Sequence, residues 1–482
     1  MNRLGIVISL VLFSVPNCRA REASLEAKYR ALCASPAARN AQWAVYVADA
    51  DSGKVLFSQN PQSRLIPAST LKLFVTAAAL SLLGPDYKFK TEVYAAADVS
   101  GGILHGDIAV IGGGDPSLGS TVIAGAPDYN AVVNSWAEAV EKAGIKEITG
   151  GVVADVSLFE GLSVPGTWPY EDLGNYYAAQ AGALSINDNL YKLFFKPGVH
   201  EGEPAAALRT EPEIKGLTWT NFMLTGAPGS GDNGYIYRAP RQYEAELRGT
   251  IPPGKPEFFI KGSMPDPALF AVQRFAAALR GRGIRVGKDA SVSGAPADKR
   301  RLIAQTFSRP LKEIVFATNK RSFNFYAEML LRALAVHAGK KGSLQNGLAE
   351  LRNFIAGTTG ESVKLADACG LSKNNLASAQ SLAKMLVYMR KSPAAREFAD
   401  SLPVPGDEFS TGHIRNFCKG TAAAGKIRIK SGSLNGVRSY AGYIAAKSGK
   451  TLAFAFIING YAASGEDVDA LHEQLTETCA LL

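Results

Sequence analysis

The sequence predicts an α+β protein built from more than one domain. Its 482 residues are too many for one hydrophobic core. Its composition, 47% hydrophobic and 20% charged, is typical of a folded globular protein. Strand-like and helical stretches follow one another in long blocks, which favours sheets with helices grouped on their faces.

The first elements are expected to be a hairpin and a helix. Residues 42–58 contain two apolar runs around the turn residues Asp51-Ser52-Gly53, which predicts a β-hairpin. A helical run begins at Ser69 and ends near Leu83, before Gly84-Pro85. Ser69 therefore starts a helix, where backbone N–H groups favour negative charge. Lys72 lies one turn deeper, where burial would lower the pKa of its amine toward that of a useful base.

The middle of the chain has a different character. Residues 89–300 contain many short strand-like runs between glycine-rich turns, such as those ending at 111 and 155. One helix is expected from Pro267 to Arg280. We interpret this region as one or two β-rich domains inserted after the Ser69 helix.

Helices return after residue 310 and strands end the chain. Helical patterns cover 311–318, 325–338 and 379–390, and a final helix covers 467–481. Strands are expected at 426–432, 437–446 and 451–459, joined by the turn dipeptides Asn435-Gly436 and Ser448-Gly449. One antiparallel sheet flanked by helices would then use both chain ends.

The first twenty residues are typical of a secretory signal peptide. Arg3 precedes an apolar run from Leu4 to Val15 that is too short to span a bilayer, and Ala20 supplies a small residue for cleavage. A lipid anchor at Cys18 is disfavoured by Asn17. No later stretch is long and apolar enough for a transmembrane anchor, so the mature protein is expected to be soluble and exported.

Charge is consistent with an anionic cell-wall partner or with solubility alone. Cleavage removes two arginines and no acid, so the net charge of +9 falls to +7. Nucleic acid is disfavoured because Lys and Arg are scattered along the chain. The five histidines are far apart and no metal motif occurs, so neither a metal nor a cofactor is expected.

Four cysteines remain after cleavage, and an exported protein with an even number favours disulfides. The pairing Cys33–Cys479 with Cys369–Cys418 is the prediction, because chain ends often meet. Buried free thiols are the alternative.

Three short motifs follow one another along the chain in the order found in one class of enzymes. They are Ser69-Thr70-Leu71-Lys72, Ser322-Phe323-Asn324 and Lys430-Ser431-Gly432. Together they form the S-x-x-K, S-x-N, K-[ST]-G set of enzymes that acylate a serine. A serine hydroxyl needs a neighbouring base to become a good nucleophile, and a lysine three positions on lies on the same helix face.

Each motif also has an ordinary explanation. A second S-x-x-K match is Ser381 to Lys384, within an expected helix, and Lys447-Ser448-Gly449 repeats the third motif at a hairpin tip. Ser322 and Asn324 are common helix-capping residues. Residues 229–234 and 420–426 resemble phosphate-binding loops, but strand-like residues follow both, so we interpret them as loops.

The motifs and their surroundings resemble the class C low-molecular-mass penicillin-binding proteins, the D-alanyl-D-alanine carboxypeptidase/endopeptidase family. Matching segments span nearly all of the mature chain: 67–72, 112–118, 183–189, 319–328, 420–426 and 430–434. Ser322 follows Ser69 by 253 positions, a gap that fits the family's inserted domains and exceeds that of class A β-lactamases. Two departures are Phe323, where the family has Asp or Gly, and Cys369, where it has Ser.

The resemblance implies a fold and domain boundaries. A penicillin-binding transpeptidase-like domain, an antiparallel sheet flanked by helices, would carry two nested β-rich inserted domains. After the signal peptide (1–20), the catalytic domain would be discontinuous. The boundaries are 21–88 with 302–482 for the catalytic domain, 89–158 with 262–301 for inserted domain II, and 159–261 for inserted domain III.

The resemblance also implies residue roles. Ser69 would be the nucleophile and Lys72 its base, while Asn324 orients Lys72. Ser322, assisted by Lys430, would pass the proton to the leaving D-alanine. The hydroxyls of Ser431 and Ser433 would hold the terminal carboxylate of the substrate. The backbone N–H groups of Ser69 and Ser433 would form the oxyanion hole. Asp155 would bind an amino group of the stem peptide or serve only as a turn residue.

The resulting interpretation is a periplasmic serine DD-peptidase. It would act on peptidoglycan stem peptides, as carboxypeptidase or endopeptidase, and bind β-lactams covalently. The alternatives are a silent wall-binding protein disabled by Phe323, and a β-lactamase. The oligomeric state is open, with a homodimer as one alternative.

Overall fold

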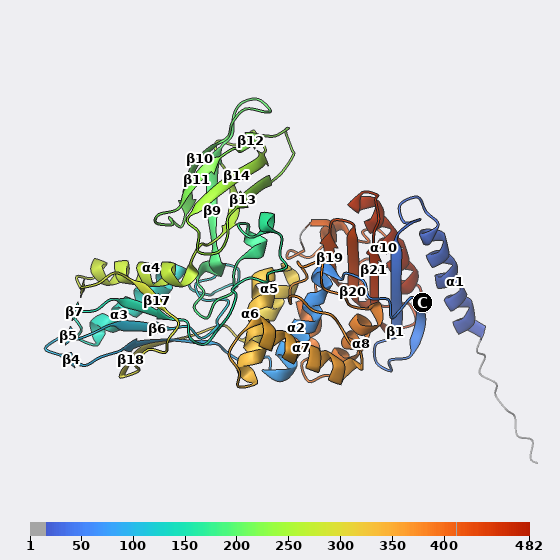
Figure 1. Ribbon diagram of the computed structural model, residues 1–482. Coiled ribbons are helices and arrows are strands. Elements are labelled where there is room, and N and C mark those ends of the chain that lie inside the picture. Colours follow the sequence, from blue (N-terminus) through green and yellow to red (C-terminus); the bar gives the residue numbers. More distant parts are fainter. Residues whose placement is uncertain (1–15, 411) are drawn as a thin grey trace, which may run out of the picture.

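The computed structural model describes residues 16–410 and 412–482. Most of the predicted signal peptide, residues 1–15, therefore lies outside the described residues, and helix α1 (Pro16–Cys33) crosses the expected cleavage point. Among the described residues, no helix is long and apolar enough to cross a membrane. Figure 1 shows a lobe that contains both ends of the described chain, with one arm extending sideways and another standing upright.

The lobe is built on a five-stranded antiparallel sheet of order β19-β20-β21-β1-β2. Its strands are β1 (Gln42–Asp49), β2 (Val55–Gln59), β19 (Ile427–Leu434), β20 (Val437–Ala445) and β21 (Thr451–Asn459). The three predicted hairpins are confirmed. Gly436 and Gly449 have φ values of +72° and +81°, which glycine adopts without strain at these turns.

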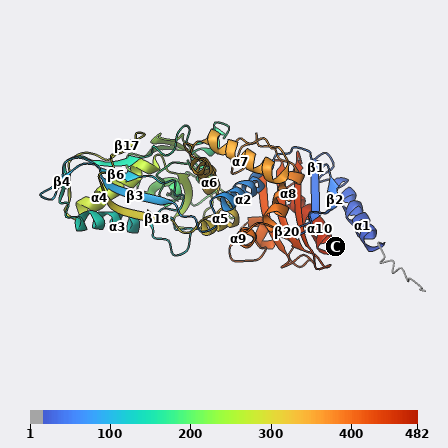
Figure 2. The same cartoon turned by 90° about the horizontal axis from the view of Figure 1, so that it is seen from below.

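Successive residues of β1 contribute to two different cores. Ala44 and Tyr46 belong to the core beneath helices α2 and α8, whereas Trp43 and Val45 belong to the core beneath α10. Because side chains of a strand alternate between the two faces, one helical layer covers each face of the sheet. Figure 2 shows these strands and helices from below.

Most predicted helices are confirmed within two residues. One face of the sheet carries α2 (Lys72–Leu82), α5 (Leu311–Lys320), α6 (Asn324–His337), α7 (Leu344–Thr359), α8 (Ala379–Arg390) and α9 (Ala395–Ser401), and the other carries α1 and α10 (Gly465–Ala480). Ser378 and Ser381 form a capping box at the start of α8. Ser381 therefore has a structural role, and Lys384 pairs with Glu361.

The sideways arm contains two sheets. A five-stranded sheet of order β17-β8-β6-β3-β18 packs against α3 (Tyr129–Lys142) and α4 (Pro267–Gly281), beside a small sheet of order β16-β7-β5-β4. The strands are β3 (Lys90–Ala95), β4 (Val99–Ser100), β5 (Ile103–Leu104), β6 (Ile108–Ile111), β7 (Glu147–Ile148), β8 (Val152–Asp155), β16 (Arg285–Val286), β17 (Ser291–Ser293) and β18 (Arg301–Phe307). Because β3 and β18 pair, the chain enters and leaves the arm side by side. The predicted domain boundary at residue 302 falls inside β18.

The upright arm also contains two sheets. Their orders are β10-β9-β15 and β11-β14-β12, with β13 paired to β14. The strands are β9 (Leu190–Lys196), β10 (Ala206–Glu211), β11 (Thr218–Asn221), β12 (Leu224–Thr225), β13 (Asn233–Tyr237), β14 (Glu244–Ile251) and β15 (Phe258–Ser263). Short 3-10 turns, η2 (Tyr170–Asp172) and η3 (Tyr176–Ala178), connect this arm to the lobe. The glycine cluster 229–234 leads into strand β13, as predicted.

The predicted disulfides are wrong, because Cys33, Cys369, Cys418 and Cys479 are all free. Cys369 lies in the core beneath α2, whereas Cys418 lies in the core beneath α10, so the sheet separates them. Cys33 interacts with the Tyr29 hydroxyl one turn earlier in α1. Cys479 is fully buried in α10.

The free thiols give a direct prediction. Protein beginning at residue 21, purified without reductant and then denatured, is expected to react with four equivalents of a thiol reagent, because no cysteine is paired. Reductant should leave its free energy of unfolding unchanged. Cys33→Ser should lower the count to three, and a count of two or none in the parent protein would contradict the structure.

Candidate active site

Ser69 lies in a 3-10 turn, η1 (Ala68–Leu71), that leads directly into α2. The Thr70 hydroxyl donates to the Pro67 carbonyl oxygen at 2.7 Å. The Ser439 hydroxyl of β20 donates to the same oxygen at 2.5 Å. These contacts hold η1 on the sheet, so the position of Ser69 is fixed by the strands beneath it.

Two glycines allow this close approach. A Cβ at Gly432 of β19 would lie 2.6 Å from the Pro67 oxygen and 2.7 Å from the Ser69 nitrogen. A Cβ at Gly370 would lie 1.9 Å from the Ala68 oxygen, and its φ of +86° also favours glycine. The final Gly of the third motif is therefore required by the backbone geometry around Ser69.

The Lys72 amine is the centre of a buried hydrogen-bond cluster. Its Nζ lies 2.8 Å from Ser69 Oγ, 2.7 Å from Asn324 Oδ1 and 2.6 Å from the Cys369 carbonyl oxygen. The lysine side chain is completely buried. All three donor positions of the ammonium group are thus directed at acceptors.

Burial lowers the pKa of Lys72, because a charged amine is poorly solvated there. The negative charges of Asp367 and Glu328 oppose this shift. A lysine with a lowered pKa can be neutral near physiological pH and act as a base.

The Cys369 carbonyl is positioned by two buried acids that the sequence analysis did not find. Glu328 of α6 accepts hydrogen bonds from the Ala368 and Cys369 N–H groups and pairs with Arg332. Asp367 accepts from the N–H groups of Gly370 and Ser372, from Asn375, and from the indole of Trp168. Both carboxylates therefore hold the loop 367–372 against Lys72, although Glu328, Asp367 and Cys369 also have the spacing of metal ligands.

The second Ser–Lys pair lies beside the first. Ser322 occupies the break between α5 and α6 with φ +53°, and Lys430 Nζ donates to its Oγ at 2.9 Å. Lys430 is 1% exposed. Burial lowers its pKa well below the ordinary lysine value, and the positive charge of nearby Lys72 lowers it further.

The strand β19, which carries the third motif, is one of the two edge strands of the sheet. The Ile429 N–H donates to the Pro403 oxygen at 2.8 Å, on the side away from β20. Because alternate N–H groups of a strand point the same way, those of Ser431 and Ser433 also point away from β20. Ser433 is exposed.

Ser69 lies between two cavities. The first, of about 260 Å³, is lined by Lys320, Ser322, His413, Lys430, Ser431 and Ser433 among others. The second, of about 520 Å³, is lined by the upright arm on one side and by Ser322, Phe323 and Asn324 on the other. Its arm-side wall contains residues that the sequence analysis missed: Glu171, Asp172, Tyr176, Tyr177 and Tyr235.

The arm also contributes to the catalytic cluster itself. The Tyr177 carbonyl oxygen accepts a hydrogen bond from Asn324 Nδ2 at 2.8 Å, so the amide oxygen of Asn324 faces Lys72. The Tyr177 hydroxyl donates to Asp172, and burial raises the pKa of that carboxyl group. No local sequence pattern signals these long-range contacts.

Phe323 lines the second cavity and also belongs to the core. Its ring centroid lies 4.6 Å from that of Tyr326, and it packs against the core beneath α2. The unusual residue of the middle motif is therefore a wall residue that is anchored by packing.

The structure does not bring Asp155 to Ser69. Asp155 is buried at the end of β8, where its carboxylate accepts from the N–H groups of Ser157 and Ala297 at 2.9 Å each. These bonds join two loops of the sideways arm. Its binding role stays a prediction, and the contacts favour the turn role.

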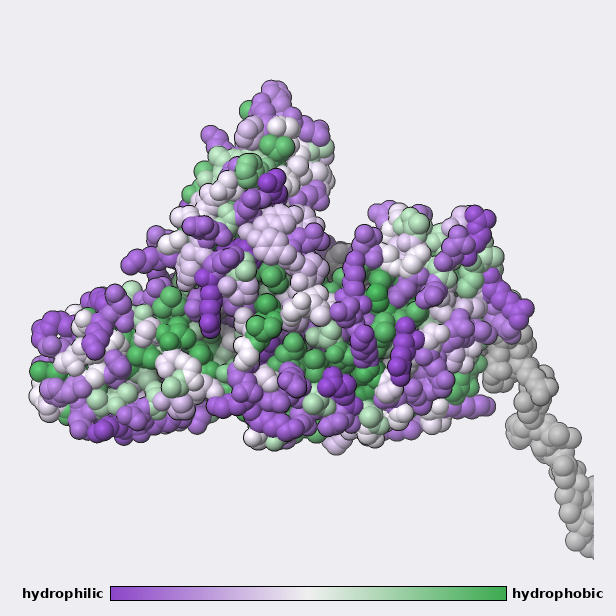
Figure 3. Space-filling view, in the orientation of Figure 1, coloured by the Kyte–Doolittle hydropathy of each residue, from purple (hydrophilic) through white to green (hydrophobic). Residues whose placement is uncertain are grey.

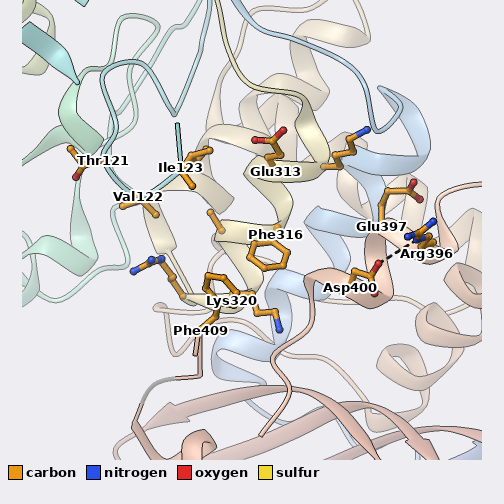
Figure 4. Close-up of a pocket in the computed structure, with 14 residues that line it drawn as sticks. Thr121, Val122, Ile123, Glu313, Phe316, Lys320, Arg396, Glu397, Asp400 and Phe409 are labelled. Atoms are coloured by element: carbon orange, nitrogen blue, oxygen red, sulfur yellow. Dashed lines mark ion pairs between the residues drawn. The ribbon is translucent and has the colours of Figure 1, made fainter. Parts of the chain in front are cut away.

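A larger cavity, of about 680 Å³, lies on the far side of α5 and does not include Ser69. Figure 4 shows Phe316 and Phe409 beside Lys320, with the Arg396–Asp400 ion pair at the rim. Lys320, which pairs with Asp407 at 2.5 Å, lines both this cavity and the smaller one at Ser69. The described residues that line the 680 Å³ cavity include no nucleophile–base pair, so the candidate active site is the one beside Ser69.

A serine with a buried lysine one turn deeper, beside a second Ser–Lys pair and an edge strand, defines the penicillin-binding class of serine peptidases. Residues 25–480 match the D-Ala-D-Ala carboxypeptidase 3 (S13) family, and the chain belongs to this family. It is thus a serine-type D-Ala-D-Ala carboxypeptidase, as its motifs predicted.

Individual relatives agree with this assignment. The chain is 31% identical over 455 residues to the D-alanyl-D-alanine carboxypeptidase of Actinomadura sp. (strain R39), covering 92% of this chain and 82% of the relative. It is 23% identical to D-alanyl-D-alanine carboxypeptidase DacB of Haemophilus influenzae, covering 85% and 84%. The crystal structure of penicillin binding protein 4 (dacB) from H. influenzae has the same fold, with a TM-score of 0.78 at 21% identity and coverage of 95% of this chain and 97% of that one.

Gly432→Ala should impair the site without unfolding the protein. The added methyl would contact the Pro67 oxygen and the Ser69 nitrogen, and forcing η1 outward costs about 1–3 kcal/mol. We expect the second-order rate constant for acylation by benzylpenicillin to fall about tenfold or more. Gly166→Ala, where a Cβ meets nothing within 4 Å, is the matched control. Equal rates in both variants would contradict the proposed tight contact.

Proposed function

We propose that the enzyme removes the terminal D-alanine of peptidoglycan stem peptides, or cuts D-alanine cross-links between them, through an acyl-enzyme on Ser69. The observation that carries the proposal is the 2.8 Å separation between Ser69 Oγ and the buried Lys72 amine. β-Lactams would acylate the same oxygen and remain attached.

Acylation would begin with proton transfer from Ser69 to neutral Lys72. The Ser69 oxygen then attacks the carbonyl carbon of the penultimate D-alanine, and the developing oxyanion would accept from the N–H groups of Ser69 and Ser433. The edge position of β19 supports this role for Ser433, because its N–H points away from β20. General base assistance of this kind contributes about 10²–10⁴-fold.

The leaving amine requires a proton, and the second Ser–Lys pair would deliver it. Lys430 donates to Ser322 Oγ. Ser322 would pass its own proton to the departing nitrogen, and the proton that Lys72 took from Ser69 would replace it. Burial lowers the pKa of Lys430, and the positive charge of Lys72 lowers it further, which disfavours a state in which both amines are charged. The hydroxyls of Ser431 and Ser433 would hold the terminal carboxylate in the smaller cavity.

The motifs alone left two alternatives to the peptidase, and both disagree with the family to which the chain belongs. A silent wall-binding protein is disfavoured by the intact hydrogen bonds of Lys72 and Lys430. A β-lactamase would need a deacylating base near Ser69. The acids that line the second cavity, Glu171 and Asp172, are the available carboxylates, and Asp172 already accepts from Tyr177.

We place the reaction in the periplasm, where peptidoglycan is accessible. The predicted signal peptide and the net positive charge support this location. The homodimer stays a prediction.

Acylation should depend on pH in a defined direction. Lys72 must be neutral to act as a base, and its folded-state pKa is lowered by burial. The rate of acylation by benzylpenicillin should therefore rise with pH through that lowered pKa and then level off. Lys384→Met, which removes the lysine of the second S-x-x-K match, should leave the profile unchanged because Lys384 pairs with Glu361 and not with Ser69 or Lys72 in the part of the chain that the structure describes. A rate that falls as pH rises through neutrality would exclude Lys72 as the base.

Intact-mass spectrometry with benzylpenicillin, followed by peptide mapping, tests the function directly. A persistent single adduct on Ser69 is expected, and Ser69→Ala should abolish both the adduct and D-alanine release. Ser381→Ala is the matched control, since Ser381 only caps α8. No adduct on the parent protein would favour the silent protein, whereas consumption of penicillin without a lasting adduct would favour a β-lactamase.

A further inference from the structure

A row of tyrosines leads away from the Ser69 cavity along the upright arm. We call it the tyrosine strip (Tyr235, Tyr237 and Tyr170). Tyr235 lines the cavity together with Ser69. The ring of Tyr237 follows at a centroid distance of 6.3 Å, and that of Tyr170 at a further 6.0 Å. Tyr235 is 41% exposed and Tyr170 is 59% exposed, so aromatic surface is presented to solvent.

The backbone holds the strip in place. Tyr235 and Tyr237 lie on the same face of β13, because completely buried Ile236 separates them. The Ile236 N–H donates to Asn175 Oδ1 at 3.1 Å, which ties β13 to the segment between η2 and η3. Tyr170 belongs to η2, which packs on β13. Such rigid aromatic rings lose little conformational entropy on binding.

The three tyrosine side chains of the strip are neutral. On the neighbouring strand, Arg248 lies opposite Tyr235 and Glu246 lies opposite Tyr237. These two side chains form an ion pair with each other. Within the described chain, none of the three tyrosine hydroxyls forms a hydrogen bond, so each is available to a ligand. A neutral ligand with both apolar faces and hydroxyl groups is therefore the best match.

We propose that the tyrosine strip binds the saccharide strand to which the stem peptide is attached. A pyranose ring has an apolar C–H face that stacks on the electron-rich face of tyrosine, and edge hydroxyls that bond to the phenol groups. In Figure 3, a pale patch of intermediate hydropathy covers the base of the upright arm, beside a hollow that separates it from the lobe. This inference rests on the proposed function, because it assigns a second part of the same substrate.

The order of the groups along the substrate fits this arrangement. An extended residue spans at most about 3.3–3.6 Å, so the four residues between the Ser69 acyl group and the sugar cover about 13–14 Å. Because Tyr235 borders the cavity that would hold the peptide, the sugar at the far end of the peptide would lie beyond that wall, where Tyr237 and Tyr170 follow at centroid steps of 6.3 and 6.0 Å. The charged groups of the peptide would meet Asp172, Arg321 and Lys373 in the cavity.

The test compares two substrates with the same stem peptide. D-Alanine release is measured from the free pentapeptide and from the same pentapeptide on its disaccharide, with the parent protein and with the double variant Tyr170→Ala/Tyr237→Ala. Phe259→Ala is the matched control, because Phe259 is also 41% exposed but lies on the other sheet of the arm. We expect the disaccharide to raise kcat/KM about tenfold in the parent and the control, and the double variant to lose this gain with its rate on free pentapeptide unchanged.

A gain that survives in the double variant would overturn the proposal, as would an equal loss on both substrates. Benzylpenicillin acylation at the parental rate confirms that the variant is folded. Calorimetric titration of Ser69→Ala protein with an N-acetylglucosamine tetramer gives a readout without catalysis. Binding that the double variant abolishes supports the strip even if D-alanine release fails, and absence of binding to the parent contradicts it. Failure to cleave free pentapeptide would contradict only the proposed function.

Discussion

The buried amine of Lys72 is the contact on which the rest of the site depends. Its three hydrogen bonds join the turn that carries Ser69, the start of α6 and the loop after residue 366. A charged amine without water is stable only where acceptors are already in place. The fold therefore has to position a hydroxyl, an amide and a carbonyl around one point before chemistry is possible.

Much of that positioning is done by groups that never touch substrate. Glu328 and Asp367 hold the loop whose carbonyl meets Lys72, and Arg332 offsets part of the buried negative charge. Removing one partner of such a network leaves a buried charge uncompensated, which typically costs 3–5 kcal/mol. Beneath Ser69, Gly432 and Ser439 position the turn η1, Gly432 by close packing and Ser439 by its hydrogen bond to the Pro67 oxygen.

The sequence predicted what depends on local pattern and missed what depends on distance. Hairpins with Asn-Gly or Ser-Gly turns and strongly periodic helices were predicted well, and the three motifs do meet at Ser69. Helix α7 was missed because Gly347, Gly357 and a Thr pair weaken its pattern. The cysteine pairing was wrong because counting cannot reveal which face of a sheet each thiol occupies. Glu328 and Asp367 were missed because their partners are distant in the chain.

The inserted arms form hydrogen bonds with residues of the catalytic site. The Tyr177 carbonyl fixes the amide of Asn324, and the Trp168 indole donates to Asp367, which holds the loop of the Cys369 carbonyl. Two of the three acceptors around Lys72, the Asn324 amide and the Cys369 carbonyl, are therefore held in place by residues outside the lobe. The lobe alone therefore lacks some of the residues that hold its catalytic site in place. A minimal β-lactam sensor made by deleting the arms would lose Tyr177 and Trp168, which hold the acceptors around Lys72. New loops grafted onto the far strands of the arms would leave these two residues in place.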